Sequence, residues 1–172
     1  MQKFEYNFDR FVGLNKKEMG FRDVVEDIVT FVKEDSDKDY RVIVGSDSEG
    51  YGDVAYATAV VIHRIGSGGR AFISKNIVYT PRSLRSKIYN EAMLSLYLGQ
   101  QILPELISAG LLEENFVIHV DIGPNGETKD MIKEVTGMVK GFGFQVATKP
   151  ESYAASSVAD RFAVPPKIIS AA

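Results

Sequence analysis

The chain has 172 residues, of which 45% are hydrophobic, and a formal net charge of −3. This size allows one domain with a substantial core, so we expect residues 1–172 to form a single domain. The apolar stretches are strand-sized and interrupted by charge, which predicts no membrane span, and no signal-peptide core is evident at the start. Cysteine is absent, which excludes disulfides and thiolate chemistry and favours a cytoplasmic protein. The acidic balance argues against strong non-specific attraction to nucleic acid, although bound metal ions would supply local positive charge.

The first part of the chain is predicted to hold one helix and three strands. Apolar residues from Phe21 to Val32 recur at helical spacing, which predicts a helix over roughly residues 17–34 in an N-terminal extension, residues 1–38. Three strands rich in Val, Ile, Ala, Tyr and Phe follow, separated by glycine-containing turns that predict an antiparallel meander. These strands are expected at about 40–47, 54–64 and 71–79.

The second part is predicted to alternate helices and strands. The segment Thr80–Ser83 opens a long helix that runs to about Gly110, with Pro104 expected to bend or split it. A strand, a helix, a strand and a short helix should then follow at about 115–121, 127–140, 144–148 and 153–162. The tail 163–172 is expected to be loose.

This order, β-β-β-α-β-α-β-α, predicts an α/β fold with a mixed five-stranded sheet and helices on both faces. Right-handed crossovers return the chain to a free sheet edge, so strand 115–121 should lie beside strand 40–47. Each of these strands ends on an aspartate, Asp47 and Asp121, a residue that strands disfavour. Open α/β sheets bind ligands at such strand ends, and adjacent carboxylates repel unless a proton or a divalent cation lies between them.

Two further acids are candidates, each with a simpler alternative. Glu91 belongs to a helical stripe that should face the sheet and that also contains Leu84, Ile88, Ser95 and Leu98. Alternatively, Glu91 pairs with Lys87 on a solvated surface. Asp160 lies in a run of small residues whose helix would approach a sheet or a ligand closely, or it forms a surface pair with Arg161. Taken alone, each surface alternative is favoured, since charged side chains are usually exposed.

These acids and this element order together resemble the ribonuclease H-like superfamily. Four segments further resemble the YkuK-like bacterial family, which is described as ribonuclease H-like: Val44–Ser48, His119–Gly126, Ser152–Ser156 and Val158–Arg161. The resemblance spans roughly residues 5–162 and implies a ribonuclease H-like fold. It also implies that the metal ligands are Asp47, Glu91, Asp121 and Asp160, the last at a position where the superfamily has a variable acid or histidine. No basic protrusion for gripping a hybrid duplex is evident, which argues against a true ribonuclease H substrate.

Carboxylates gathered in one notch favour hard cations, Mg²⁺ or Mn²⁺, and two such ions hold an in-line displacement at phosphorus. The predicted function is therefore a metal-dependent nuclease that acts on RNA, an RNA–DNA hybrid or structured DNA by a two-metal mechanism. One alternative is a weak or silent site in a binding module that contacts protein or RNA. The other is a metal phosphoesterase for small phosphate esters.

Four residues near the acids are candidates for contact with substrate: Ser48, Asn125, Lys149 and Arg161. Asn125 lies in Pro-Asn-Gly and is first a turn residue, while Lys149 and Arg161 have solvated surface positions as their alternative. His119 precedes Asp121 by two residues and is expected to be a core histidine rather than a ligand.

Overall fold

A mixed sheet forms the centre of the computed structural model, which describes residues 6–49 and 52–152, with the backbone alone at 76–79. Seven strands build this sheet within the described residues: β1 (Phe11–Gly13), β2 (Glu18–Met19), β3 (Tyr40–Glu49), β4 (Val54–Arg64), β5 (Gly69–Tyr79), β6 (Phe116–His119) and β7 (Gln145–Ala147). They lie side by side in the order β2-β1-β5-β4-β3-β6-β7. The meander of β3, β4 and β5 is antiparallel as predicted, and β4 begins and ends where the sequence pattern places it.

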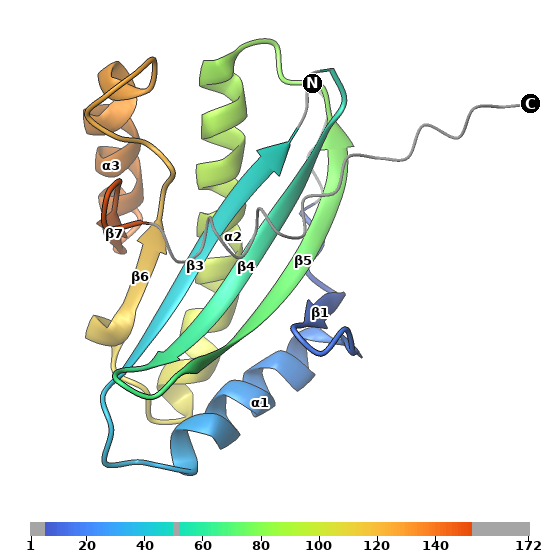
Figure 1. Ribbon diagram of the computed structural model, residues 1–172, viewed down its shortest axis with the longest axis vertical. Helices are drawn as coiled ribbons and strands as arrows, with labels where there is room; N and C mark the ends of the chain where they lie inside the picture. The colour runs from blue at the N-terminus through green and yellow to red at the C-terminus, as the bar shows by residue number, and fades with distance from the viewer. Residues whose placement is uncertain (1–5, 50–51, 153–172) are drawn as a thin grey trace, which may run out of the picture.

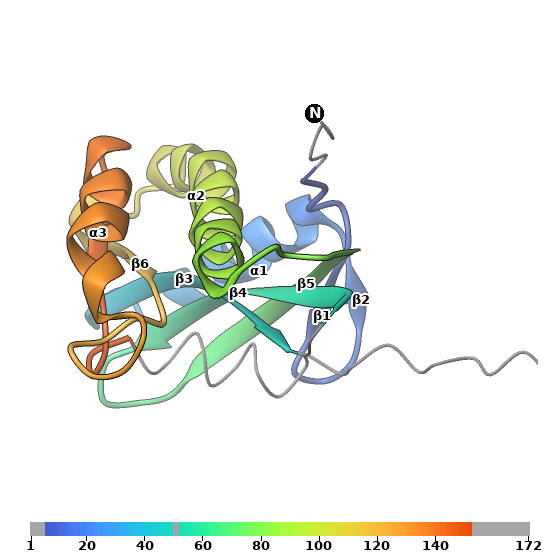
Figure 2. The same ribbon diagram turned by 90° about the horizontal axis from the view of Figure 1, so that it is seen from above.

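Helices α1 (Phe21–Lys33), α2 (Leu84–Ser108) and α3 (Ile132–Gly141) pack on one face of the sheet (Figures 1 and 2). Two short 3₁₀ helices, η1 (Glu113–Asn115) and η2 (Lys129–Met131), join them to the strands. The described helices therefore cover one face of the sheet and not both faces as predicted from the sequence, and the helix expected at 153–162 lies outside the described residues. Asp160, Arg161 and the tail 163–172 lie outside them as well. Within the described part of the chain, no helix has both the length and the apolar composition that a membrane span requires.

The N-terminal extension differs from the prediction of a single helix. Strand β2 pairs with β1, and β1 pairs with β5, so the sheet has seven strands rather than five. Helix α1 begins at Phe21 and not near residue 17, because the Gly20 N–H donates to Asp23 Oδ2 at 2.7 Å and the chain before it is extended. Strands of two or three residues are too short to show a period-two pattern in the sequence.

Helix α2 is continuous through Pro104, so the predicted split is wrong. Its first turn is capped by Ser83, whose Oγ accepts a hydrogen bond from the Ser86 N–H at 3.2 Å. Pro104 removes the hydrogen bond to the carbonyl of Gln100. Both residues are exposed, so water can satisfy this carbonyl and the helix continues.

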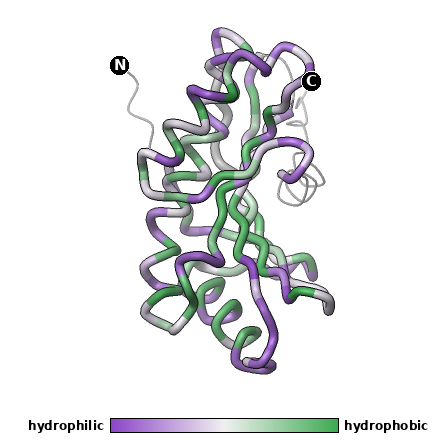
Figure 3. The backbone as a smooth tube through the Cα atoms, turned by 90° about the vertical axis from the view of Figure 1, so that its left-hand side faces the viewer, coloured by the Kyte–Doolittle hydropathy of each residue, from purple (hydrophilic) through white to green (hydrophobic). Residues whose placement is uncertain are grey.

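The hydrophobic core lies between the sheet and the three helices, and hydrophobic residues follow the central strands in Figure 3. Helix α2 packs closely against β6 because residue 99 is glycine. A Cβ at Gly99 would lie 3.1 Å from Ile118 Cδ1 and 3.3 Å from the Phe144 ring. This close approach brings the buried side of α2 to the centre of the sheet.

Strands β3 and β6 are parallel neighbours, as predicted. Their register runs from Val42 beside Phe116 to Gly45 beside His119. Asp47 and Asp121 each follow the last of these pairs by two residues, so both lie at the carboxyl ends of adjacent parallel strands. Strand β7 is parallel to β6 on its other side, and its carboxyl end therefore points toward the same region.

Candidate active site

Asp47 is held near the carboxyl end of β3, between two serines that face the helices. Side chains alternate along a strand, and Ser46 and Ser48 both contact α2, so Asp47 lies on the opposite face. Its side chain is half-buried, and its Oδ1 accepts a hydrogen bond from the Ser48 N–H at 2.8 Å. The carboxylate is thus fixed at the end of the strand where the sequence predicts a ligand site.

Glu91 enters the site from the buried side of α2. Its side chain is 6% exposed, and the Ser48 hydroxyl donates a hydrogen bond to Glu91 Oε1. The alternative in which Glu91 pairs with Lys87 on a solvated surface is therefore wrong. Ile88, Ser95 and Leu98 of the predicted stripe are buried too, whereas Leu84 in the first turn is 42% exposed.

The electrostatic environment of Glu91 links it to the other two acids. The pKa of Glu91 is raised to about 8, mainly by burial, and the hydrogen bond from Ser48 opposes this rise. The negative charges of Asp47 and Asp121 contribute to this rise, while the positive charge of Lys87 opposes it. In the absence of a bound cation, Glu91 is therefore protonated at neutral pH.

A chain of hydrogen-bonded, buried hydroxyl groups lies next to Glu91 between α2 and the sheet. Ser46 Oγ lies 2.8 Å from Ser95 Oγ and 2.9 Å from Thr58 Oγ1, and the Ser95 hydroxyl donates to the Glu91 carbonyl at 3.0 Å. These hydrogen bonds tie α2 to β3 and β4 and satisfy polar groups that would otherwise be costly to bury. Sequence reasoning did not identify this network. Two pairs in the sequence indicate such a network. Ser46 and Ser48 lie at alternate positions of one strand, and Glu91 and Ser95 lie one helical turn apart on one side of the long helix.

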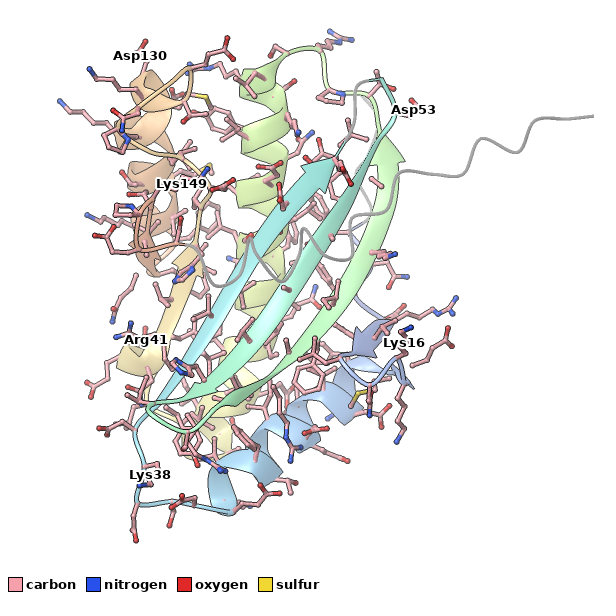
Figure 4. All side chains as sticks on the ribbon, viewed as in Figure 1. Lys16, Lys38, Arg41, Asp53, Asp130 and Lys149 are labelled. Atoms are coloured by element: carbon pink, nitrogen blue, oxygen red, sulfur yellow. The ribbon has the colours of Figure 1, made fainter. Side chains whose placement is uncertain are left out.

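Asp121 follows β6 and forms an ion pair with Lys149. Lys149 Nζ lies 2.8 Å from Asp121 Oδ1, close enough for an ion pair although not aligned as a regular hydrogen bond. Contact with Asp121 raises the pKa of Lys149, and the charges of Asp47 and Glu91 raise it further. Figure 4 shows Lys149 near the carboxyl end of β6, on the side toward α2. The ammonium therefore lies in the field of all three acids.

The remaining predicted positions differ in burial. Asn125 is exposed in the turn before Gly126, whose φ is 84°. His119 is 7% exposed and so is buried, as predicted, and burial lowers its pKa to about 4. The hydroxyl of Ser48 is directed to Glu91. Direct contact of Ser48 or Asn125 with substrate stays a prediction.

Within residues 6–49 and 52–152, no group of three or more Asp, Glu or His side chains is arranged so that it could hold a metal ion. Carboxylate oxygens are the ligands that Mg²⁺ and Mn²⁺ prefer, and Asp47 and Asp121 lie close enough to Glu91 to act on its charge. Asp47 points to the face of the sheet opposite to α2, so a shared cation would have to be held around the end of β3. In the observed state Asp121 is paired with Lys149 and Glu91 accepts from Ser48. The candidate fourth ligand, Asp160, lies outside the described residues.

Comparisons with known proteins identify the family. Residues 23–164 match the family model described as Ribonuclease H-like. The chain is also 33% identical over 168 residues to the uncharacterized protein YkuK of Bacillus subtilis (strain 168), an alignment that covers 88% of this chain and 95% of that protein. No solved structure matches the chain. With its mixed sheet and its acids at the ends of parallel strands, the chain belongs to the ribonuclease H-like family.

Proposed function

We propose that this protein is a divalent-metal-dependent nuclease that hydrolyses phosphodiester bonds of RNA, an RNA–DNA hybrid or structured DNA. The observation that carries the proposal is the buried carboxyl group of Glu91, whose pKa is raised by burial and by Asp47 and Asp121. Gathering acids in this way destabilises a fold, and such perturbed groups cluster at functional sites. Membership of the ribonuclease H-like family supports a nuclease-type activity at a coarse level.

In this proposal Asp47, Glu91 and Asp121 hold the metal, with Asp160 as a fourth ligand. Bound Mg²⁺ or Mn²⁺ would activate water and stabilise the charge that develops on the phosphate and on the leaving oxygen. The Ser48 hydroxyl orients the Glu91 carboxylate, and the hydroxyl chain behind it keeps α2 at a fixed distance from β3.

Contacts with the substrate complete the proposed site. Asn125 is exposed in the loop after Asp121, where its amide can donate to a phosphate or sugar oxygen of the substrate. Lys149 and Arg161 are the basic candidates for contact with the phosphate backbone. The two-metal mechanism, the choice of metal and the class of nucleic acid are parts of the same proposal.

The experiment that tests this function is a cleavage assay in Mg²⁺ or Mn²⁺ on labelled single-stranded RNA, RNA–DNA hybrid, duplex DNA and a four-way junction. The wild type is compared with Asp47→Asn and with Asp130→Asn, purified identically. Asp130 is an exposed acid in η2 and serves as the matched control for loss of one carboxylate. We expect metal-dependent cleavage by the wild type and Asp130→Asn, and its loss in Asp47→Asn. Equal cleavage by all three proteins, or none by the wild type, would reject the nuclease.

A binding module with a weak or silent site is the second candidate. The ion pair between Lys149 and Asp121 favours it, because this contact neutralises one of the acids without any metal. Gel-shift binding of the same nucleic acids without cleavage would support this candidate. A small chromogenic phosphate diester in the same panel tests the third candidate, a phosphoesterase, which should hydrolyse the ester but none of the nucleic acids.

A further inference from the structure

Lys149 is placed among the acids by two features of the backbone around it. Its N–H donates to the carbonyl of Ile122 at 2.8 Å, which attaches the chain after β7 to the loop after β6. Its side chain then passes over Gly123, where an added Cβ would lie 3.0 Å from Lys149 Cβ and 3.6 Å from Lys149 Cδ. A larger residue at position 123 would thus push the lysine stem away. The local backbone holds the ammonium against Asp121.

This contact differs from an ordinary surface ion pair. The Asp121 side chain is only 25% exposed, although that of Lys149 is 56% exposed. The lysine charge also interacts with Asp47 and, when Glu91 is ionised, with Glu91, so one ammonium lies near acids that come from β3, α2 and the end of β6. A divalent cation held by these carboxylates would be attracted to the same place and would be repelled by the ammonium.

We propose that Lys149 is an internal counterion of the acidic site, which occupies the cation position beside Asp121 and competes there with divalent metal. The proposal rests on the proposed function, since it takes the three acids to be the metal ligands. It adds that metal binding must break the Lys149–Asp121 contact and move the ammonium. The affinity of the site for metal is then set partly by a residue that is not a ligand.

The test measures metal affinity rather than activity. Mn²⁺ is titrated into the metal-free full-length protein by calorimetry, and free Mn²⁺ is followed by electron paramagnetic resonance. The variants are Lys149→Met, which removes the charge and keeps the stem, and Lys149→Arg, which keeps the charge. Lys140→Met, an exposed lysine at the end of α3, controls for the change in net charge. Thermal unfolding of each variant confirms that it is folded.

We expect Lys149→Met to bind Mn²⁺ about two- to fivefold more tightly than the wild type, the size of effect that a partly exposed ion pair can exert. Lys149→Arg and Lys140→Met should bind as the wild type does. Equal or weaker binding by Lys149→Met would overturn the inference.

Asp47→Asn, alone and combined with Lys149→Met, separates this inference from the proposed function. If the wild type binds Mn²⁺ and this binding requires Asp47, but Lys149→Met binds Mn²⁺ no more tightly, only the counterion role of Lys149 is rejected. If neither the wild type nor Lys149→Met binds Mn²⁺, or if Asp47→Asn binds as tightly as the wild type, the metal site fails and the counterion role fails with it.

Discussion

Charged residues are arranged differently at the two ends of the central sheet. At the end covered by α1, Arg64 lies 4.0 Å above the Phe31 ring and 3.6 Å from Glu34, and its Nε donates to Tyr40 Oη at 2.8 Å. Arg70 pairs with Asp27 and Glu34 and lies 4.7 Å from the same ring. Cations and carboxylates alternate here, and each supports the packing of α1.

At the carboxyl ends of β3 and β6, acids are instead gathered around one another. Glu91 is buried there with a raised pKa, and Asp47 and Asp121 act on it. Lys149 compensates part of this charge from a position that is more than half exposed. Acids that only stabilise a fold are interleaved with cations, as beside α1. Gathered acids destabilise the fold, which is the arrangement expected where a cation or substrate is bound.

The largest expected effect separates the two ends by activity. Asp121→Asn should reduce metal-dependent cleavage by about 10³-fold, or about 4 kcal/mol, because it removes a charge that would hold the metal. Asp27→Asn removes an acid at the α1 end and should leave the rate unchanged. Initial rates on the substrate identified by the cleavage panel measure both. A similar loss in the two variants would mean that charge alone, and not its position, controls activity.

The next effect separates the ends by stability. Phe31→Ala should lower the free energy of unfolding by about 3 kcal/mol, since it removes a buried ring and both arginine contacts. Phe142 is 47% exposed, and Phe142→Ala should change this free energy by less than about 0.5 kcal/mol. Urea unfolding gives both values. If folded Phe31→Ala binds metal as tightly as the wild type, the two ends are independent. A large loss of metal affinity in this variant would show that the two ends are coupled.

The pH dependence of stability is a property of the acidic end. The pKa of Glu91 is about 8 in the folded protein against an ordinary value of 4.5, so between these values the folded state holds more protons than the unfolded chain. This contribution to the free energy of unfolding is complete below the ordinary value and is lost as the pH rises through the folded one. Glu91→Gln cannot lose this contribution. As the pH rises between these two values, the free energy of unfolding of the metal-free variant should therefore increase relative to that of the wild type, by up to about 1.4 kcal/mol per pH unit.

Urea unfolding between about pH 5 and about pH 8 measures this gain. Glu134→Gln is the control, because hydrogen bonds from Tyr89 and Arg85 lower the pKa of Glu134 and it titrates below this range. The control should keep the slope of the wild type. Parallel curves for the wild type and Glu91→Gln would show that Glu91 does not hold a proton in the folded state.

The smallest effect concerns the ion pairs beside α1. Arg70 is about a third exposed, so Arg70→Gln should cost about 0.5–1 kcal/mol in the free energy of unfolding. Added salt should reduce this loss, because partly exposed charges are screened. Thermal unfolding at low and high salt checks the prediction, with the exposed Lys38→Gln as the control. A loss that is unaffected by salt would assign the contribution of Arg70 to packing instead.

The long strands and their order were accessible to sequence reasoning. The pattern over 54–64 predicts β4 to its ends, and the crossover rule predicts β6 beside β3. The strands β1 and β2 were not accessible, because segments this short are stabilised by pairing with β5 and not by their own composition. The helix predicted from residue 17 therefore began too early.

The positions of Asp47, Glu91 and Asp121 in the fold were predictable from the sequence, but their contacts were not. Helical spacing placed Glu91 on the sheet-facing stripe, but the usual exposure of charged residues favoured the surface. Its burial is a tertiary property, since it depends on Ser48 and on the hydroxyl chain from Ser46 to Ser95. The pairing of Lys149 with Asp121 likewise requires β7 to lie beside β6, which no local pattern specifies.

A crystal structure of the protein grown with Mn²⁺ tests the central claim most directly, because anomalous scattering locates manganese without reference to activity. We expect an anomalous peak at carboxylate-ligand distance, about 2.2 Å, from oxygens of Asp47 and Asp121, with Glu91 beside it. Lys149 Nζ should have left Asp121. A map with no peak among these acids and with the 2.8 Å Lys149–Asp121 contact intact would contradict the metal site.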